Sequence, residues 1–432
     1  MALERMDRLL GEVYEFRSGL SKPASEFGSG HPFLTFKDVF YNYFVPETLG
    51  DLVNSTDADR DAGDVKRGDV FLTRTSETMD ELGMSCVALR DVPLATFNGF
   101  SKRLRPKPGS PIVPEYAGYF FRSPQFRREV TAMSSMSTRA SLNNGMLSRL
   151  RITLPDVVTQ AAIGATLKSL DDKIEQNQRT ARALEQLAGA VFQAWFVDFE
   201  PVKAKAAGAT TFPSMPQPVF DALSTRFVDS AVGPVPQGWE GGPIKRLATI
   251  SKVQVNPQDN PEEVVDHFSL PAYDATMSPI VEAGSVIKSG KFLVVAGCVL
   301  VSKLNPRIAR VWLPPPPAGR RQIASTEFLV VIPRQVSDRH HLYCQFQQTA
   351  FREELVQGTS GTSNSHQRVR PDDVLNRMII VPSPPTRVAF AGLVDPLFAL
   401  MSANRDECAK LATLRDYLLP KLLSGVVRVE AE

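Results

Sequence analysis

The sequence has few cysteines, and their spacing excludes the usual structural uses of this residue. The 432 residues include four, far apart and without a C-x-x-C pair, at Cys86, Cys298, Cys344 and Cys408. A disulfide framework in a small secreted domain needs closely spaced cysteines, and a structural zinc site needs paired ligands. We therefore expect reduced thiols, most of them buried.

Catalytic signatures are lacking as well. The nearest approach to a phosphate-binding loop, GSVIKSGKF from Gly284, has the wrong glycine spacing and ends in Phe292 where a Ser or Thr would ligate magnesium. The tetrapeptide [ND]-P-P-[YF], the usual target-base pocket of amino-methyltransferases, does not occur. The histidines show no metal-ligand spacing; they are His31, His267, His340, His341 and His366. The residues therefore offer no clear motif for catalysis or for a metal site.

A long apolar run and a strong net charge are also absent. No run of about 18 apolar residues appears, and the N-terminal MALERMDRLL is charged where a signal peptide would be apolar. We therefore expect a cytoplasmic protein that does not span a membrane. The net charge of +2 is too small to indicate a nucleic-acid partner, so such a partner must be argued from local clusters.

What the sequence does contain is an internal repeat. LPDVVTQAAIGATLKSLDDKIEQNQ, from Leu154, corresponds to VPSPPTRVAFAGLVDPLFALMSANR, which starts 227 residues later at Val381. Both copies carry an asparagine at the same position, Asn177 and Asn404. This offset predicts a tandem duplication and hence a pseudo-twofold architecture.

Within each copy, apolar residues alternate steps of three and four, the 3.5-residue repeat of a coiled-coil seam. The first seam is Ile163, Leu167, Leu170, Ile174, Asn177, Ala181, Leu184, Ala188, Val191 and Trp195, and the second is Phe390, Val394, Leu397, Met401, Asn404, Cys408, Leu411, Arg415, Leu418 and Leu422. Arg415 is the one charged residue of the second seam, and we place it at the edge of the packed region. From Ile163 to Trp195 a helix would rise about 48 Å.

The seam asparagines have two interpretations. A buried asparagine costs stability but fixes register, because it must find a polar partner. The alternative is that Asn177 and Asn404 face solvent. At the helix ends, Asp156 and Ser383 are N-cap candidates, Pro201 would end the first helix, and Gly425 suits the position after the second.

Ahead of each helix lies a segment of short β-rich runs such as DVFLTRT, RLRITLP, TEFLVVIP and NRMIIVP, punctuated by glycine and proline. This texture predicts α+β globular domains. PVKAKAAGATTFPSMPQPVF through VGPVPQGW is rich in alanine, proline and glycine and is typical of a linker. The expected order is a domain at 1–155, a helix at 156–200, a linker at 201–238, a domain at 239–382 and a helix at 383–425.

Basic residues cluster in both domains. From Lys102 to Arg139 there are eight basic residues against two acidic ones, and KLNPRIARVWLPPPPAGRR, from Lys303, holds five basic residues and no acid. Local excess of this kind favours phosphate contact, although a solvated surface explains any single member equally well. The candidates are Lys102, Arg103, Arg105, Lys107, Arg122, Arg127, Arg128 and Arg139, followed by Lys303, Arg307, Arg310, Arg320 and Arg321.

A protein that recognises a DNA base sequence needs directed donors and acceptors on loops. Arginine and asparagine are the residues that pair bidentately with guanine and adenine. Such residues follow similar glycine-led strands in the two copies, and a second group precedes each RLRITLP-type strand. The first group is Arg74, Thr75 and Ser76 with Lys303 and Asn305, and the second is Ser137, Thr138 and Arg139 with His366, Gln367 and Arg368.

One pattern offers an enzymatic alternative. Pro155-Asp156 followed by Asp171-Asp172-Lys173 matches the PD…(D/E)-x-K arrangement of many magnesium nucleases. That chemistry needs the residues on adjacent strands, whereas Asp171 and Lys173 lie inside an unbroken heptad pattern. A coiled-coil adaptor without DNA contact is a further alternative, against which the basic clusters argue.

With these residues in view, the whole chain resembles the specificity (S) subunits of type I restriction-modification enzymes. LDDKIEQNQ and LEQLAGAVFQAWFVDFEPV resemble the family's central conserved region, and LRDYLLPKLLSG its distal one. TRFVDSAVGPVPQGWE resembles the entry into a second target recognition domain, and GTSNSHQRVRPDDVLNRMIIVPSP the end of one.

The resemblance implies two target recognition domains separated by an antiparallel coiled coil of two long helices, including the seam residues Leu170, Ile174, Leu184, Leu397 and Leu411. Each domain would bind one half of a split sequence in double-stranded DNA, and the helices would set the gap. It also implies two modification (methyltransferase) subunits and restriction (endonuclease and translocase) subunits as partners in phage defence. S-adenosylmethionine, ATP and Mg would be bound by those partners, whereas this chain would bind no cofactor and would be non-catalytic itself.

The aromatic residues at the end of the first seam have two interpretations. Trp195, Phe196 and Phe199 are either a core plug beneath the recognition domain or an anchor for a partner subunit. We favour the plug because Trp195 itself lies on the seam.

Overall fold

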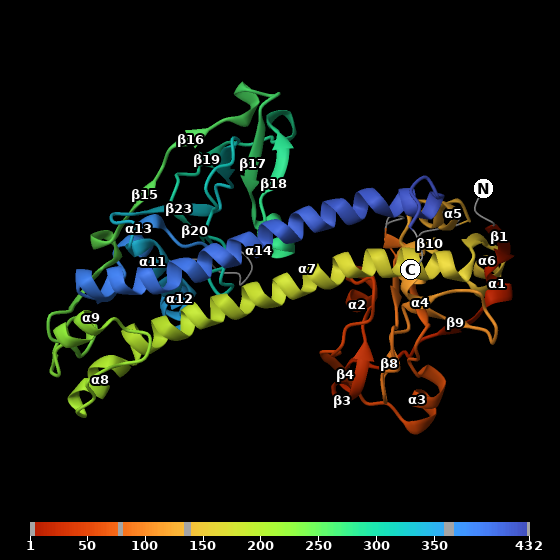
Figure 1. Ribbon diagram of the computed structural model, residues 1–432, viewed down its shortest axis with the longest axis horizontal. Coiled ribbons are helices and arrows are strands. Elements are labelled where there is room, and N and C mark those ends of the chain that lie inside the picture. Colours follow the sequence, from red (N-terminus) through yellow and green to blue (C-terminus); the bar gives the residue numbers. More distant parts are fainter. Residues whose placement is uncertain (1–4, 77–80, 134–139, 358–366, 430–432) are drawn as a thin grey trace. The chain divides into compact units, whose positions relative to one another are not determined.

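The computed structural model describes residues 5–76, 81–133, 140–357 and 367–429. The chain forms two compact units, one comprising Met1–Glu175 with Lys410–Glu432 and the other Gln176–Ala409. Both units mix helices with antiparallel and mixed sheets, which confirms the α+β class (Figure 1). Each unit also contains a part of two long helices, α7 (Val157–Phe192) and α14 (Pro384–Ser424).

The first unit is built on a four-stranded antiparallel sheet of order β2-β9-β5-β7, with smaller sheets β4-β3-β8, β1-β11 and β6-β10. Its strands are β1 (Arg5–Leu9), β2 (Tyr14–Ser18), β3 (Phe27–Leu34), β4 (Asp51–Val53), β5 (Val70–Thr73), β6 (Thr75–Ser76), β7 (Ser85–Val87), β8 (Thr96–Phe97), β9 (Ser101–Pro106), β10 (Ala140–Ser141) and β11 (Arg151–Pro155). Its helices are α1 (Leu10–Val13), α2 (Phe36–Tyr41), α3 (Asp57–Gly63), α4 (Pro114–Phe120), α5 (Pro124–Met133) and α6 (Asn144–Arg149), with the 3-10 turn η1 (Ala24–Glu26).

The second unit repeats this plan. Its four-stranded antiparallel sheet has the order β15-β23-β20-β21, and β14-β24 corresponds to β1-β11. A five-stranded sheet, β16-β19-β22-β17-β18, stands beside them. Its strands are β12 (Phe227–Val228), β13 (Val235–Pro236), β14 (Glu240–Pro243), β15 (Ala248–Ser251), β16 (Gln254–Val255), β17 (Val264–Phe268), β18 (Ile280–Ala283), β19 (Lys291–Leu293), β20 (Val299–Ser302), β21 (Val311–Trp312), β22 (Arg321–Ala324), β23 (Phe328–Pro333) and β24 (Met378–Val381).

The helices of the second unit cover these sheets and join the two long helices. They are η3, a π-helical turn (Gln193–Val197), α8 (Glu200–Ala206), α9 (Gln217–Ala222), α10 (Leu270–Thr276), α11 (Asp338–Gln347), α12 (Thr349–Gln357) and α13 (Pro371–Leu375), with the 3-10 turns η4 (Ile244–Arg246), η5 (Pro257–Asp259) and η6 (Gly284–Val286).

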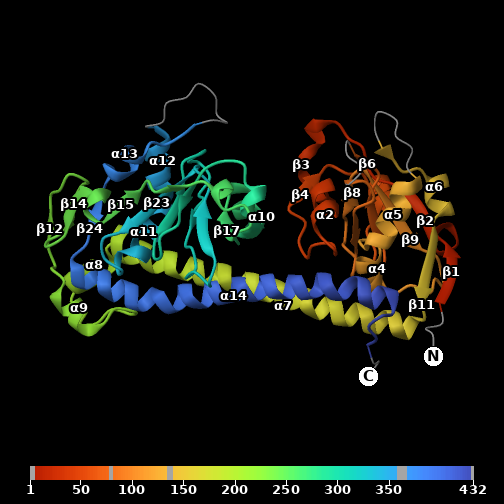
Figure 2. The ribbon, with the colours of Figure 1, turned by 90° about the horizontal axis from the view of Figure 1, so that it is seen from above.

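The long helices pair through the predicted seams. All ten positions of each seam are buried or half-buried, and in the second unit α7 and α14 run antiparallel, with Asn177 meeting Glu407 and Phe192 meeting Phe390 (Figure 2). Asp156 caps α7 by accepting from the Thr159 N–H at 2.9 Å. Gly425, with φ +78°, follows the end of α14 as expected.

The two seam asparagines differ. Asn177 is 2% exposed and donates from Nδ2 to Glu407 Oε2 at 2.7 Å. Asn404 is half-buried and donates to the Leu400 carbonyl of its own helix at 2.9 Å. The register-fixing interpretation therefore fits Asn177 alone.

Arg415 does not lie at the edge of the packing, contrary to the prediction. Its Nη1 donates to Asp171 Oδ1 at 2.6 Å, and its guanidinium lies 4.9 Å from the Tyr43 ring centroid. Tyr119 donates to the other oxygen of the same carboxylate at 2.6 Å. A polar contact thus replaces an apolar one at this seam position in the first unit.

The end of α7 differs from the prediction as well. Pro201 lies in the first turn of α8, and the helical path breaks at Phe199, which adopts the left-handed conformation with φ +55°. The segment 201–238, predicted as a linker, instead contributes α8, α9, β12 and β13 to the second unit. Val202, Phe220 and Val235 are each at most 1% exposed within its core.

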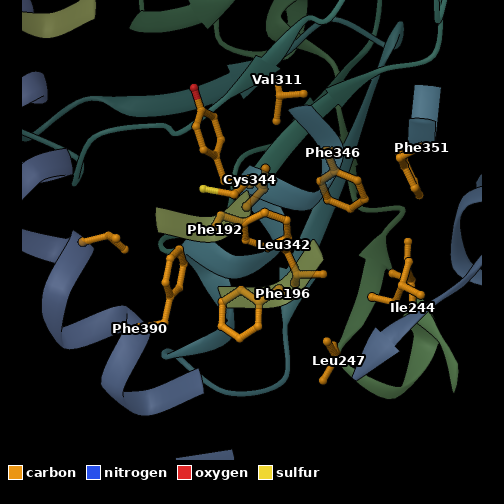
Figure 3. Packing of buried hydrophobic residues seen from close by; sticks show 14 of the residues in the cluster. Phe192, Phe196, Ile244, Leu247, Val311, Leu342, Cys344, Phe346, Phe351 and Phe390 are labelled. Carbon is orange, nitrogen blue, oxygen red and sulfur yellow. The ribbon is translucent and has the colours of Figure 1, made fainter. Parts of the chain in front are cut away.

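The core of the second unit contains the aromatic cluster at the end of α7. Trp195 and Phe196 are at most 2% exposed, and Phe196 packs against Phe390 at 5.1 Å between ring centroids (Figure 3). The plug interpretation is confirmed for both rings. Cysteines are also placed as expected: they are free, three are buried, and Cys408 is half-buried.

Of the helices in the described ranges, α14 passes a test of length and composition for a membrane span. Its apolar residues include those of the second seam, of which Phe390, Val394 and Met401 enter the core of the second unit and Leu422 that of the first. A helix that packs along a seam in this way has the same apolar composition as a membrane span, so length and composition alone do not distinguish the two.

Candidate nucleic-acid interface

Arg74 lies where three segments of the first unit meet. β5 ends at Thr73, after which the Arg74 N–H donates to the Phe100 carbonyl at 2.9 Å and the Arg74 carbonyl accepts from the Leu142 N–H at 2.8 Å. The next two residues, Thr75 and Ser76, form β6 and pair antiparallel with β10. We call this meeting point the Arg74 junction.

Lys303 occupies the equivalent place in the second unit. β20 ends at Ser302, after which the Lys303 N–H donates to the Glu327 carbonyl at 2.7 Å and the Lys303 carbonyl accepts from the Val369 N–H at 3.0 Å. The Asn305 N–H then donates to the Gln367 carbonyl at 2.9 Å. We call this the Lys303 junction.

The two junctions share one backbone frame. In each, the residue after a buried strand is hydrogen-bonded to the residue preceding a neighbouring strand, β9 or β23, and to the segment that precedes the next helix. The structure thus brings together the two groups of loop residues singled out in the sequence, as far as they are described. Ser137, Thr138, Arg139 and His366 lie outside the described residues.

The Arg74 junction concentrates positive charge. Arg74 Nη1 donates to Ser18 Oγ at 3.3 Å, and Lys102 Nζ donates to the same oxygen at 2.8 Å and to Asn144 Oδ1 at 2.7 Å. Within the described ranges, neither cation has a carboxylate partner. Burial and the charge of Arg74 both lower the pKa of Lys102. An anion placed here would relieve this repulsion.

The Lys303 junction is more balanced. Burial lowers the pKa of Lys303, Glu327 opposes that effect, and Arg368 adds to it. Arg368 Nη2 pairs with Glu327 Oε1 at 2.7 Å. Asn305 adopts the left-handed conformation with φ +53°, which asparagine tolerates better than most residues. In the part of the chain that is described, Asn305 Oδ1 and Gln367 Oε1 are buried without a hydrogen-bond donor.

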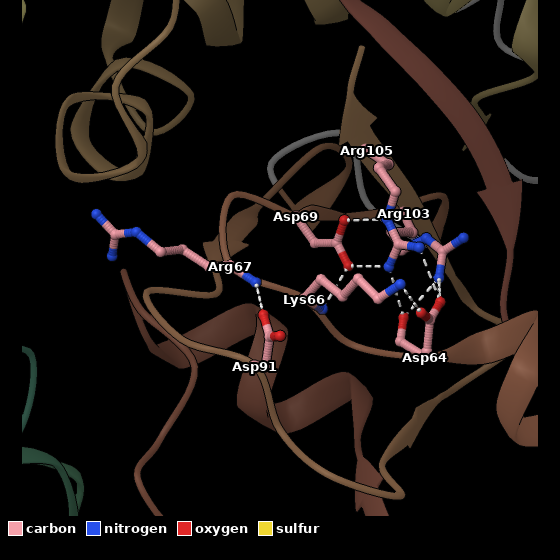
Figure 4. A network of polar contacts seen from close by, with 7 residues as sticks. All are labelled: Asp64, Lys66, Arg67, Asp69, Asp91, Arg103 and Arg105. Atoms are coloured by element: carbon pink, nitrogen blue, oxygen red, sulfur yellow. Dashed lines mark hydrogen bonds and ion pairs between the residues drawn. The ribbon is translucent and has the colours of Figure 1, made fainter. Parts of the chain in front are cut away.

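Two of the basic candidates in the first unit form ion pairs with acidic residues of the same unit. Arg103 and Arg105 both pair with Asp64, at 2.8 and 2.9 Å, and Arg105 also pairs with Asp69 at 2.7 Å (Figure 4). Arg103 is 6% and Asp69 0% exposed. The local charge excess counted along the sequence is therefore partly neutralised by acids from the preceding loop.

Other candidates are also held by internal partners. Lys107 Nζ donates to the Gly11 carbonyl at 2.7 Å, and Arg127 Nη1 donates to the Leu82 carbonyl. Three arginines of the second basic run pair with acids, Arg310 with Asp274 at 2.7 Å, Arg320 with Asp266 at 2.6 Å and Arg321 with Glu263 at 3.3 Å. Arg307 is exposed. These geometries remove the second run as a continuous positive surface.

The nuclease alternative fails on geometry. Asp156 caps α7, whereas Asp171 and Lys173 lie roughly 22 Å further along the same helix at about 1.5 Å per residue. The Asp171 carboxylate accepts hydrogen bonds from Arg415 and Tyr119. Moreover, no group of three metal-ligating side chains occurs among the residues that the structure describes.

Sequence reasoning missed residues that complete the two junctions. Ser18 and Asn144 hold Lys102, and Phe100 and Glu327 supply the carbonyls that orient Arg74 and Lys303. The sequence could have indicated two of these residues, because the 227-residue offset aligns Phe100 with Glu327. No sequence pattern indicated Ser18, since its contact with Lys102 depends on the pairing of β2 with β9.

Comparison with known proteins agrees with this arrangement. The family model for the type I restriction modification DNA specificity domain matches residues 6–186. The MjaIX type I restriction enzyme specificity subunit of Methanocaldococcus jannaschii is 26% identical over 440 residues, which cover 98% of this chain and 92% of that protein. Over nearly its whole length the chain is therefore similar to a type I restriction enzyme specificity subunit.

Further relatives point the same way. The HindI specificity subunit of Haemophilus influenzae is 24% identical over 352 residues, which cover 69% of this chain and 74% of that protein. The crystal structure of the type I S subunit from M. genitalium shares the fold, with a TM-score of 0.58 at 10% identity and coverage of 98% and 96% of the two chains.

Proposed function

We propose that this chain is the non-catalytic specificity subunit of a type I restriction-modification enzyme, and that it reads a bipartite sequence in double-stranded DNA, one half-site at the Arg74 junction and the other at the Lys303 junction. The observation that carries the proposal is the shared backbone frame of the two junctions with different side chains on it. Because the backbone hydrogen bonds are the same and the side chains differ, the two junctions are suited to recognising two different half-sequences in the same way.

The chemistry of the junctions supports base contact. Arginine and lysine donate to O6 and N7 of guanine, and asparagine and glutamine pair with adenine, in the major groove. Arg74 and Lys102 lack carboxylate partners within the described residues, so their positive charge would attract an anionic duplex to this junction. The remaining exposed basic residues, such as Arg307, would contact phosphates and contribute salt-dependent affinity.

The long helices support the spacing role. α7 alone contains 36 residues, a rise of about 54 Å, whereas half-sites on one face of DNA are about 34 Å apart. We propose that the α7–α14 pair sets the gap. The subunit would act in the cytoplasm with two modification subunits and with restriction subunits, and these partners would bind S-adenosylmethionine, ATP and Mg.

The methylation motif of cells that express this subunit with its cognate modification subunit tests the proposal. We expect a motif of two short sequences separated by several unspecified base pairs. Arg74→Ala should relax one half and Lys303→Ala the other, each lowering discrimination by about 1–3 kcal/mol. Arg8→Ala, at an exposed arginine of β1, is the control and should leave the motif unchanged. A single contiguous motif would contradict the proposal.

A further inference from the structure

Phe100 is an aromatic side chain that the fold of the first unit does not use. It is 63% exposed, although phenylalanine is usually among the buried residues. It lies in the turn that joins β8 to β9, and its carbonyl accepts the hydrogen bond from the Arg74 N–H at 2.9 Å. The ring therefore projects from the Arg74 junction itself.

The turn that carries Phe100 is held rigidly. Asn98, which is 6% exposed, accepts from the Phe100 N–H at 3.0 Å and from Ser101 Oγ at 3.2 Å, and it donates to the Leu34 carbonyl at 3.1 Å. At Gly99 a Cβ would come within 2.3 Å of Ser21 Oγ. Few conformations are thus open to the backbone beneath the exposed ring.

The junction to which Phe100 belongs is positively charged. Arg74 and Lys102 share Ser18 Oγ, and neither has a carboxylate partner in the described part of the chain. Lys102 is only 7% exposed, so the junction already holds a buried charge that an apolar protein partner on Phe100 would not compensate. A polyanion that also offers apolar surface suits both features.

The equivalent position in the second unit is Glu327, and its frame is the same. Ser325 takes the place of Asn98, with its Oγ accepting from the Glu327 N–H at 3.3 Å and its carbonyl from the Phe328 N–H at 2.9 Å. The Glu327 carbonyl orients Lys303 as that of Phe100 orients Arg74. The two copies keep the turn and exchange an aromatic ring for a carboxylate.

We infer that Phe100 is a specificity-determining residue that contacts the C5-methyl group of a thymine next to the base pair read by Arg74. The inference rests on the proposed function and adds the base class recognised at this position. In the major groove the thymine methyl is the one apolar feature of a base edge, and apolar side chains, phenylalanine included, recognise it. Because the Phe100 carbonyl binds the Arg74 N–H, the two residues would contact neighbouring bases.

A uracil scan tests the inference, because replacing thymine by uracil removes only the methyl group. The probe is a duplex that contains the methylation motif, bound by the complex of this subunit with its modification subunit. Each thymine of the half-site that depends on Arg74 is replaced in turn. We expect one position at which uracil weakens binding about four-fold, the value of one buried methyl group.

The Phe100→Ala complex gives the decisive comparison. It should bind the thymine duplex about four-fold more weakly than the wild type and should no longer distinguish uracil from thymine at that position. Tyr41→Ala, at a residue of the same unit that is 73% exposed, is the matched control and should keep the wild-type pattern. Circular dichroism of both variants checks folding.

The outcomes separate this inference from the proposed function. Specific binding without any thymine that responds to uracil overturns the inference and leaves the function intact. An equal loss by Phe100→Ala on thymine and uracil duplexes also overturns it, and indicates a wedge between base pairs instead. If the wild-type complex shows no sequence-specific binding, or if Arg74→Ala affects neither half-site, both proposals fail.

Discussion

At the scale of single residues, the partners of a charged side chain decide whether it is available to DNA. Arg103 and Arg105 are as basic as Arg74, yet they bind Asp64 and Asp69, which lie 36 to 41 residues earlier in the sequence. Breaking such a buried pair leaves an uncompensated charge, which costs several kcal/mol. These arginines are therefore committed to the fold, whereas Arg74 is not.

His341 shows the same dependence on surroundings and predicts a pH effect. It is 1% exposed, packs between Phe192 and Phe196, and neither ring nitrogen has a partner among the described residues. Burial, with a contribution from the charge of Arg387, lowers the pKa of His341 to about 3. The folded unit therefore keeps this imidazole neutral at pH values where the unfolded chain protonates it.

The difference in the His341 pKa between the folded and the unfolded chain makes the free energy of unfolding depend on pH. Between the ordinary histidine pKa of 6.5 and about 3, the unfolded chain binds one proton more than the folded one, so the free energy of unfolding falls as the pH falls through this window. Asp338 acts in the opposite direction, because burial raises its pKa despite Arg387. A substitution at His341 isolates the histidine from this opposing effect.

We expect His341→Leu to reduce the acid sensitivity of the second unit. The urea midpoint should fall less between pH 6.5 and 4 than in the wild type, because the imidazole proton no longer contributes. Tryptophan fluorescence reports on this unit alone, since Trp195, Trp239 and Trp312 all belong to it. His31→Leu, in the first unit, is the control. An unchanged pH slope in His341→Leu would contradict the assignment.

How much of the site was predictable also depends on residue type. The sequence singled out Arg74 and Lys303 as candidates because each follows a glycine-led strand and carries a directed donor, and the structure places the two in equivalent junctions. Phe100 carried no such signal, since an exposed phenylalanine has the same sequence pattern as a buried one. Its exposure depends on the three hydrogen bonds of Asn98, and these form only when the turn closes.

At the scale of elements, the helices were predictable and their polar contacts were not. The 3.5-residue spacing identified both seams, but it could not distinguish Asn177, which meets Glu407, from Asn404, which binds its own helix. Likewise, Arg415 interrupts the apolar pattern and is nevertheless packed. Its partner Asp171 lies on the other long helix and Tyr119 on α4, so the contact joins three elements of the first unit.

Arg415→Leu tests this contact. The substitution makes the seam uniformly apolar, yet we expect it to destabilise the first unit by about 1–3 kcal/mol, because Asp171 loses its charged partner while half-buried. Hydrogen–deuterium exchange of α4 and of the α7 segment in this unit should accelerate.

Two further variants complete that test. The double variant Asp171→Leu/Arg415→Leu should recover part of the loss, since no charge is then left unpaired. Lys410→Leu, at an exposed lysine of α14, controls for the added apolar surface. Exchange as slow as in the wild type after Arg415→Leu would show that the ion pair contributes nothing.

The elements between 201 and 238 were not predictable by the same means. Their alanine, proline and glycine content indicates turns, and helices as short as α8 and α9 have too few residues to show a period. They are stabilised instead by burial of Val202 and Phe220 and by Lys205, whose Nζ donates to the Asp221 carbonyl at 2.6 Å.

At the scale of the whole molecule, the duplication was the most predictable feature. The 227-residue offset implied two copies of one plan, and the sheets β2-β9-β5-β7 and β15-β23-β20-β21 realise it. Strand order itself was not predictable, because Tyr14 pairs with Pro106 across a long stretch of intervening chain. Pairing of this kind depends on packing that no local pattern specifies.

The duplication and the helix pair lead to a prediction for target spacing. Seven residues added after Asn177 in α7, together with seven before Glu407 in α14, would keep the 3.5-residue seam in phase on both helices. The pair would lengthen by about 10 Å, the rise of about three base pairs at 3.4 Å each. We expect the methylation motif to keep both half-sequences and to gain about three unspecified base pairs. The same insertion in α7 alone shifts one seam against the other and should abolish methylation. An altered half-sequence would show that the helices influence base reading, and an unchanged gap would show that another element sets the spacing.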